Sequence, residues 1–168
     1  MYGTIYTLGQ PRLMDIEGNH YGGNQAWFPI RWQRQAGCGP TAAATILTYH
    51  ALRHKKRGIC PAILKNGLPI AKEDMVDFMC QMWDYVTPGP QGLHRAEDFI
   101  YGIDNYLGTL DMQASAKILP ISRDENNRCP VDEAVAFIAN ALDMDIPVAF
   151  LNYSNGRLQN LDSWHWVT

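Results

Sequence analysis

The sequence predicts an α+β fold, in which helices come first and short strands cluster near the C-terminal end. Apolar residues recur at helical spacing in several segments before residue 143. Two later runs, apolar or alternating, are typical of strands, and Asn155-Gly156 between them is a strong hairpin signal. A chain of 168 residues suits one core, so we expect residues 1–168 to form a single domain.

The early part of the chain predicts a short strand, a long loop and a buried helix. Residues 3–8 suit the strand, and residues 15–35 lack clear periodicity and suit an ordered loop. Pro40 indicates a helix start, because proline has no N–H and none is needed at the first helical position. The alanine-rich helix that follows is apolar around most of its circumference, so we expect it to be buried and to end at Gly58.

The rest of the chain predicts three more helices and three strands. The first of these helices is the best defined, because its apolar residues follow helical spacing and the sequence TPGPQG ends it. We expect helices at about 72–85, 93–107 and 130–142, and strands at 114–121, 146–153 and 163–168.

Composition and charge exclude several functional classes. Hydrophobic residues make up 46% of the chain and charged residues 18%, which is typical of a globular protein. The net charge of -3 gives no general attraction to nucleic acid or to anionic membranes, so neither is expected as a partner. No signal peptide is visible and no apolar run is long enough to span a membrane. We therefore expect a cytoplasmic protein.

Only one of the four cysteines has neighbours that indicate chemistry. Cys60 and Cys129 each precede a proline and suit loop boundaries, and Cys80 lies in an apolar helical stretch and suits the core. No CxxC pair or zinc-type histidine spacing accompanies them, so no metal site is predicted. Cys38 is the exception, and the sequence around it is GCGPT.

Cys38 immediately precedes the predicted helix, where the helix dipole and unpaired backbone N–H groups stabilise a thiolate. The glycines on either side leave room for a substrate carbonyl, and the Cys38 N–H is placed to stabilise an oxyanion. A buried cysteine in a turn before an ordinary helix is the alternative interpretation. Local sequence alone does not separate the two.

A thiolate nucleophile needs a base, and His165 is the best candidate. His50 and His54 lie on the helix of Cys38, and a rise of about 1.5 Å per residue puts His50 roughly 18 Å away. His94 suits a surface or capping position, whereas His20 in the early loop stays open.

His165 lies between Trp164 and Trp166 in the last predicted strand. Strand alternation directs both tryptophans to one face and His165 to the other, which would orient the imidazole well for proton transfer. A core or edge histidine without catalytic function is the alternative.

The sequences QAGCGPTAAA around Cys38 and WHWVT around His165 resemble the papain-like cysteine peptidase superfamily, in particular its bacterial branch related to the double-glycine leader peptidases. The resemblance implies a papain-like α+β fold, with a central N-terminal helix that bears the nucleophile packed on a C-terminal antiparallel sheet. It implies a cysteine hydrolase (a thiol protease) that cleaves a peptide or related amide bond through an acyl-enzyme, without a cofactor.

The resemblance also implies a glutamine that helps form the oxyanion hole, about six residues before the nucleophile. That position is Trp32 here, which departs from the family pattern. Gln33 and Gln35 lie close by, and Gln25 lies further back. We choose Gln33 for this role, because Gln35 is too near Cys38 to fold back over the sulfur.

An Asp or Asn that orients the histidine follows it by more than a dozen residues in the family, yet the sequence given stops at Thr168. A papain-like domain would thus lack its final strands, and Asp162 could substitute only if the strand bends. Two other functions stay open: an acyltransferase that uses the same Cys–His site, and a non-catalytic binding domain with a papain-like fold.

Overall fold

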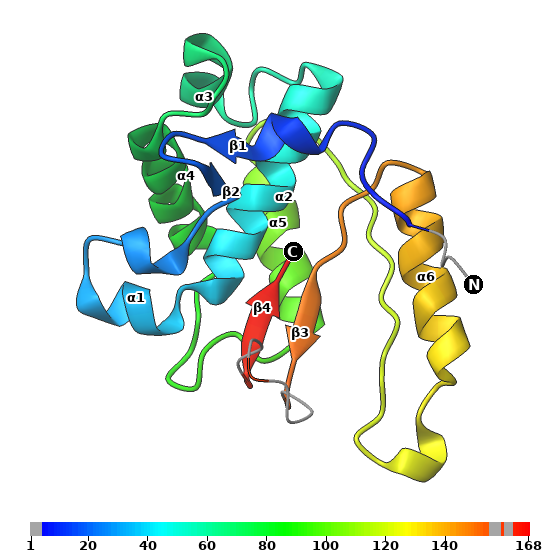
Figure 1. Ribbon diagram of the computed structural model, residues 1–168. Coiled ribbons are helices and arrows are strands. Elements are labelled where there is room, and N and C mark those ends of the chain that lie inside the picture. The colour runs from blue at the N-terminus through cyan, green and yellow to red at the C-terminus, as the bar shows by residue number, and fades with distance from the viewer. Residues whose placement is uncertain (1–4, 155–158, 160–162) are drawn as a thin grey trace.

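The computed structural model describes residues 5–154, 159 and 163–168, and it has a mixed α+β architecture (Figure 1). The α-helices are α1 (Arg31–Ala36), α2 (Cys38–His54), α3 (Pro61–Asn66), α4 (Lys72–Tyr85), α5 (Ala96–Gly108) and α6 (Val131–Asp143). The strands are β1 (Asp15–Ile16), β2 (His20–Tyr21), β3 (Phe150–Asn152) and β4 (His165–Val167). Short 3-10 helices are η1 (Pro11–Met14), η2 (Gln25–Trp27) and η3 (Glu125–Asn127).

Helix α2 is the centre of the molecule and confirms the predicted buried helix. It contacts α4, α5, α3, η1 and β4, and Ala43, Ala44 and Ala51 are fully buried along it. Small side chains let these neighbours approach closely. The helix ends at Lys55, which adopts the left-handed conformation with φ 54°, so the predicted end at Gly58 is wrong by one turn.

The two sheets are small, separate and antiparallel. β1 pairs with β2, and β3 pairs with β4 in a register that sets Phe150 opposite Val167 and Asn152 opposite His165. β4 also lies against α2 (Figure 1), so the late sheet packs on the central helix.

Several predicted elements agree with the structure and two do not. α4 has the predicted bounds of 72–85, and α5, α6, β3 and β4 fall within or near their predicted ranges. Residues 114–121 run extended but have no ladder partner in the part of the chain that the structure describes, so the strand predicted there is wrong. Residues 5–8, the described part of the first predicted strand, form no strand either. The predicted loop at 15–35 contains β1, β2, η2 and α1.

Helix α6 lies at the side of the molecule, next to the long extended connection that precedes it (Figure 1). Ala139 is the single buried residue of α6, whereas Val131 is 76% exposed. Among the described residues, no helix combines the length and apolarity that crossing a membrane requires.

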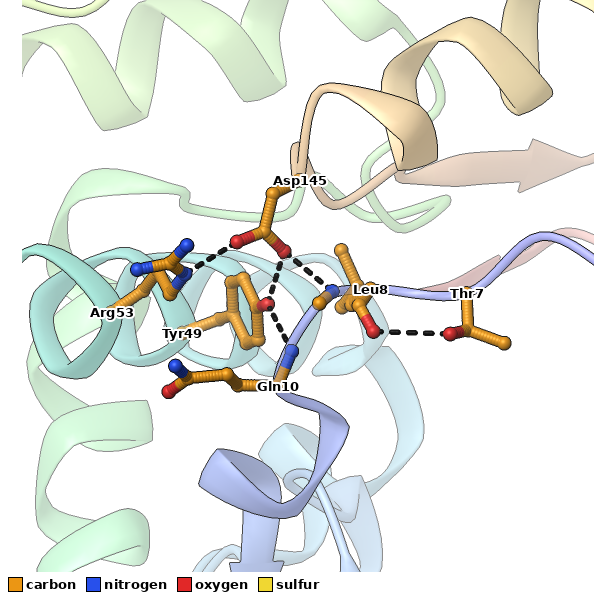
Figure 2. A network of polar contacts seen from close by, with 7 residues as sticks. Thr7, Leu8, Gln10, Tyr49, Arg53 and Asp145 are labelled. Carbon is orange, nitrogen blue, oxygen red and sulfur yellow. Dashed lines mark hydrogen bonds and ion pairs between the residues drawn. The ribbon is translucent and has the colours of Figure 1, made fainter.

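Asp145, in the turn after α6, joins three distant segments (Figure 2). Its carboxylate accepts hydrogen bonds from the Gly9 N–H at 2.7 Å, the Tyr49 hydroxyl and the Arg53 Nε–H. The Tyr49 hydroxyl in turn accepts from the Gln10 N–H at 3.2 Å. The hydrogen bond from Tyr49 is the main cause that lowers the pKa of Asp145 to about 2. This Asp145 junction fixes the N-terminal segment and the α6–β3 turn to α2.

Candidate active site

Cys38 is the first residue of α2, so the helix starts one residue earlier than predicted, and a turn at Gly37 leads into it. A Cβ added to Gly37 would lie 2.4 Å from the Phe28 ring and 2.4 Å from the Gln33 carbonyl oxygen, so no side chain fits there. The Cys38 N–H has no acceptor within α2, because it belongs to the first turn. The nucleophile candidate is therefore buried at a closely packed helix start, and Phe28 and Gln33 occupy the space beside Gly37 that was expected to admit a substrate carbonyl.

Gln33 lies in α1, and its backbone carbonyl contacts Gly37, the residue before Cys38. The Gln33 side chain is half-buried, and its Oε1 has no hydrogen-bond partner within the described ranges. Gln35 and Trp32 are exposed on the same helix. Of the three positions considered from sequence, Gln33 is the one whose side chain turns inward.

His165 is half-buried at the start of β4, and the next residue, Trp166, anchors the strand. The Trp166 ring stacks on Phe99 with centroids 4.4 Å apart and an interplanar angle of 12°. Its Nε1–H donates to the Leu93 carbonyl at 2.7 Å. Because side chains alternate along a strand, this anchor turns His165 to the opposite face of the sheet.

Trp164 does not act as the second anchor that alternation predicted. It lies outside β4, has a left-handed backbone with φ 58° and is 58% exposed. The strand geometry begins only at His165, so the expectation that both tryptophans share one face by alternation is wrong.

Leu93, in the connection between α4 and α5, bridges the two candidate residues. Its side chain packs on Gly39, where a Cβ would come within 2.7 Å of Leu93 Cδ2. Its carbonyl accepts the Trp166 hydrogen bond. One residue therefore contacts both the neighbour of Cys38 and the neighbour of His165, and this contact holds β4 beside the start of α2.

Asn152 on β3 stands directly opposite His165 in the ladder, and it is buried. Opposite residues of an antiparallel pair point to the same face with Cβ atoms about 4.5–5.5 Å apart, so the amide is within reach of the imidazole. Sequence reasoning missed Asn152. The available signal was a polar residue inside the apolar run IPVAFLNY. Asp162, the residue considered from sequence, and the Asn155-Gly156 turn lie outside the described residues.

Two of the other thiols, Cys60 and Cys80, are poorly suited to act as nucleophiles. Burial is the main cause that raises the pKa of Cys60 to about 12. Burial also raises the pKa of Cys80, and the carboxylates of Asp77 and Asp84 add to this effect. A raised pKa keeps a cysteine in the unreactive thiol form.

Three of the other histidines are engaged elsewhere, and His94 is exposed in the connection between α4 and α5. His50 stacks on His54 with ring centroids 5.7 Å apart near the C-terminal end of α2, and burial is the main cause that lowers the pKa of His50. His20 packs edge-on against Trp27 with centroids 5.1 Å apart. His165 is thus the histidine whose strand contacts the helix of Cys38.

No family model, curated protein or solved structure matches the chain.

Proposed function

We propose that the chain is a cysteine hydrolase that cleaves a peptide or related amide bond, with Cys38 as nucleophile and His165 as base. The observation that carries the proposal is the Leu93 bridge, which ties the residue after Cys38 to the residue after His165. The arrangement of a buried helix that starts with the cysteine, packed against an antiparallel sheet with the histidine, supports a papain-like fold.

The mechanism follows from these positions. The Cys38 thiolate attacks the amide carbonyl, and the Cys38 N–H with the Gln33 side-chain amide stabilises the oxyanion. His165, as imidazolium, gives its proton to the leaving amine, and an acyl-enzyme forms. Neutral His165 then takes a proton from water, the hydroxide attacks the thioester, and the acid is released with regeneration of the thiolate.

Asn152 has the position to orient His165 in this mechanism. Its side chain shares a face of the β3–β4 ladder with the imidazole, and its burial restricts its own movement. An amide that accepts a hydrogen bond from one imidazole nitrogen fixes the tautomer and leaves the other nitrogen for the thiol. We therefore assign Asn152 as a positioning residue rather than a catalytic one.

Thiol labelling tests the site without knowledge of the substrate. Iodoacetamide should alkylate Cys38 at pH 6 to 7 faster than the half-buried Cys129 of the same chain, and His165→Ala should remove that advantage. Asn152→Ala should reduce the difference in alkylation rate between Cys38 and Cys129 and shift the pH profile of Cys38 alkylation. Asn152→Asp should retain part of the rate difference. If Cys38 reacts no faster than Cys129 at neutral pH, the chain is a non-catalytic domain and the proposal is wrong.

The acyl acceptor is tested separately. A peptide library incubated with the chain in water should give products with free carboxylic acids. The amount of product should be proportional to the concentration of chain with a reactive Cys38. If products form only when an amine acceptor is added, the same site performs acyl transfer and the hydrolase assignment is replaced.

A further inference from the structure

Two aromatic side chains next to the proposed site enclose a guanidinium group. Tyr153 follows Asn152, and Trp164 precedes His165. Their ring centroids are 5.3 Å apart and the rings meet at 75°, forming what we call the aromatic corner. The guanidinium carbon of Arg123 lies 4.4 Å from the Tyr153 centroid and 5.1 Å from the Trp164 centroid. Both distances fall within the range of cation–π attraction.

The aromatic corner is fixed from both sides. The Tyr153 hydroxyl donates to the His94 carbonyl, the neighbour of the Leu93 carbonyl that anchors Trp166. Trp164 has a left-handed backbone with φ 58°, a conformation that is unfavourable for a non-glycine residue. Such a conformation persists where surrounding contacts determine the position, and it is common at binding sites.

Arg123 occupies the aromatic corner through its guanidinium group. Its side chain is exposed, and no carboxylate within the described ranges lies at ion-pair distance from its guanidinium. It belongs to the connection between α5 and α6, which has no ladder pairing at residues 114–121. The Tyr153 and Trp164 rings therefore hold the Arg123 guanidinium. Because Arg123 is exposed, a guanidinium group from solvent can compete with it for the aromatic corner.

We propose that the aromatic corner is a subsite for an arginine side chain of the substrate, and that Arg123 fills it when no substrate is bound. The assignment rests on the proposed function, because the pairing of Asn152 with His165 places Trp164 one residue from the proposed base and Tyr153 one residue from its positioning residue. One residue along a strand is about 3.3 Å, a distance that the arginine side chain of a peptide bound beside His165 spans.

Binding to a chain that lacks the nucleophile tests this subsite directly. The chain with Cys38→Ser is titrated with acetyl-Gly-Arg-Gly-amide and with its citrulline counterpart, a neutral isostere. The Trp164 indole N–H signal reports binding and is identified by its loss in Trp164→Leu. In the Arg123→Gln variant the arginine peptide should bind about two- to fivefold more tightly than in the parent, which corresponds to one exposed cation–π contact, and the citrulline peptide should not gain.

Three variants control the experiment. Lys117→Gln removes the same charge from the same exposed connection and should change nothing. Trp164→Leu and Tyr153→Leu, each combined with Arg123→Gln and followed by the peptide's own signals, should abolish the preference for arginine over citrulline. Equal affinities for the two peptides in Arg123→Gln, or a preference that survives both ring variants, would overturn the subsite. Because the titration needs no thiol, failure of Cys38 labelling would refute the hydrolase and leave the binding result readable.

Discussion

Helices α2 and α6 both have apolar sequences, yet α2 is mostly buried and α6 is mostly not. Eleven of the seventeen residues of α2 are buried, whereas one of the thirteen residues of α6 is buried. α2 has helices and a strand around it, and α6 lies at the side of the molecule (Figure 1). An apolar pattern therefore indicates only how much apolar surface a helix has available to bury. The number of elements around it decides how much surface it does bury.

Truncation of one apolar side chain in each helix gives the largest expected contrast. Leu47→Ala in α2 removes a buried side chain and should lower the free energy of unfolding by about 2–5 kcal/mol. Ile138→Ala in α6 removes a side chain that is 40% exposed and should cost less than about 1 kcal/mol. Urea denaturation measures both, and equal losses would contradict the contrast.

The Asp145 junction holds the turn after α6 to α2, so Asp145→Asn should give the next largest effect. Loss of its charged hydrogen bonds should cost about 1.5–3 kcal/mol. Asp143→Asn is the matched control, because Asp143 is an exposed aspartate two positions earlier, at the end of α6.

The pH dependence sharpens this prediction. The folded pKa of Asp145, about 2, lies below its ordinary value of 3.8, so the fold favours the ionised form. The stabilisation is therefore complete above the ordinary value and is lost as the pH falls toward 2. In thermal melts, the melting temperature of the parent should fall more steeply than that of Asp145→Asn as the pH drops from 3.8 to about 2. Parallel pH dependences would contradict the stabilising role of the Asp145 carboxylate.

The close packing just before α2 leaves no space for a side-chain atom at Gly37. Gly37→Ala places a Cβ against the Phe28 ring and the Gln33 carbonyl, and the overpacking should cost about 1–3 kcal/mol. Gly108 at the end of α5 has nothing within 4 Å of its ideal Cβ, so Gly108→Ala should be neutral or stabilising by up to about 1 kcal/mol. Chemical denaturation distinguishes the two, and a neutral Gly37→Ala would show that the turn can relax.

The smallest effect is expected on the exposed face of α6. Val135 is 55% exposed, so Val135→Lys should change the free energy of unfolding by no more than about 0.5 kcal/mol. A loss comparable to that of Leu47→Ala would mean that this face is covered in solution.

Local patterns predicted the helices well and the strands poorly. The bounds of α4 were predictable because both its apolar spacing and its terminating sequence are local signals. The end of α2 was not, because Lys55 adopts a left-handed conformation that glycine usually provides. Residues 114–121 have a strand-like sequence, but a strand requires a partner, and pairing depends on distant parts of the chain.

In the candidate site too, local sequence signals predicted some features, whereas features that depend on distant parts of the chain were missed. The position of Cys38 at a helix start follows from the glycine and proline beside it, and the face of His165 follows from the anchored Trp166. Asn152 could not be found in this way, because its place opposite His165 depends on the register between two strands. The bridge through Leu93 was equally inaccessible, since it links three segments that are far apart in sequence.

The Asp145 junction also sets an order of events for a newly made chain. Gly9 and Asp145 are 136 positions apart, and helices α1 to α6 lie between them. At a synthesis rate of roughly 5–20 residues per second, Gly9 waits on the order of ten seconds before its acceptor exists. Gly9 is thus translated long before the partner of its N–H, and the residues around it stay accessible to chaperones and proteases throughout that interval.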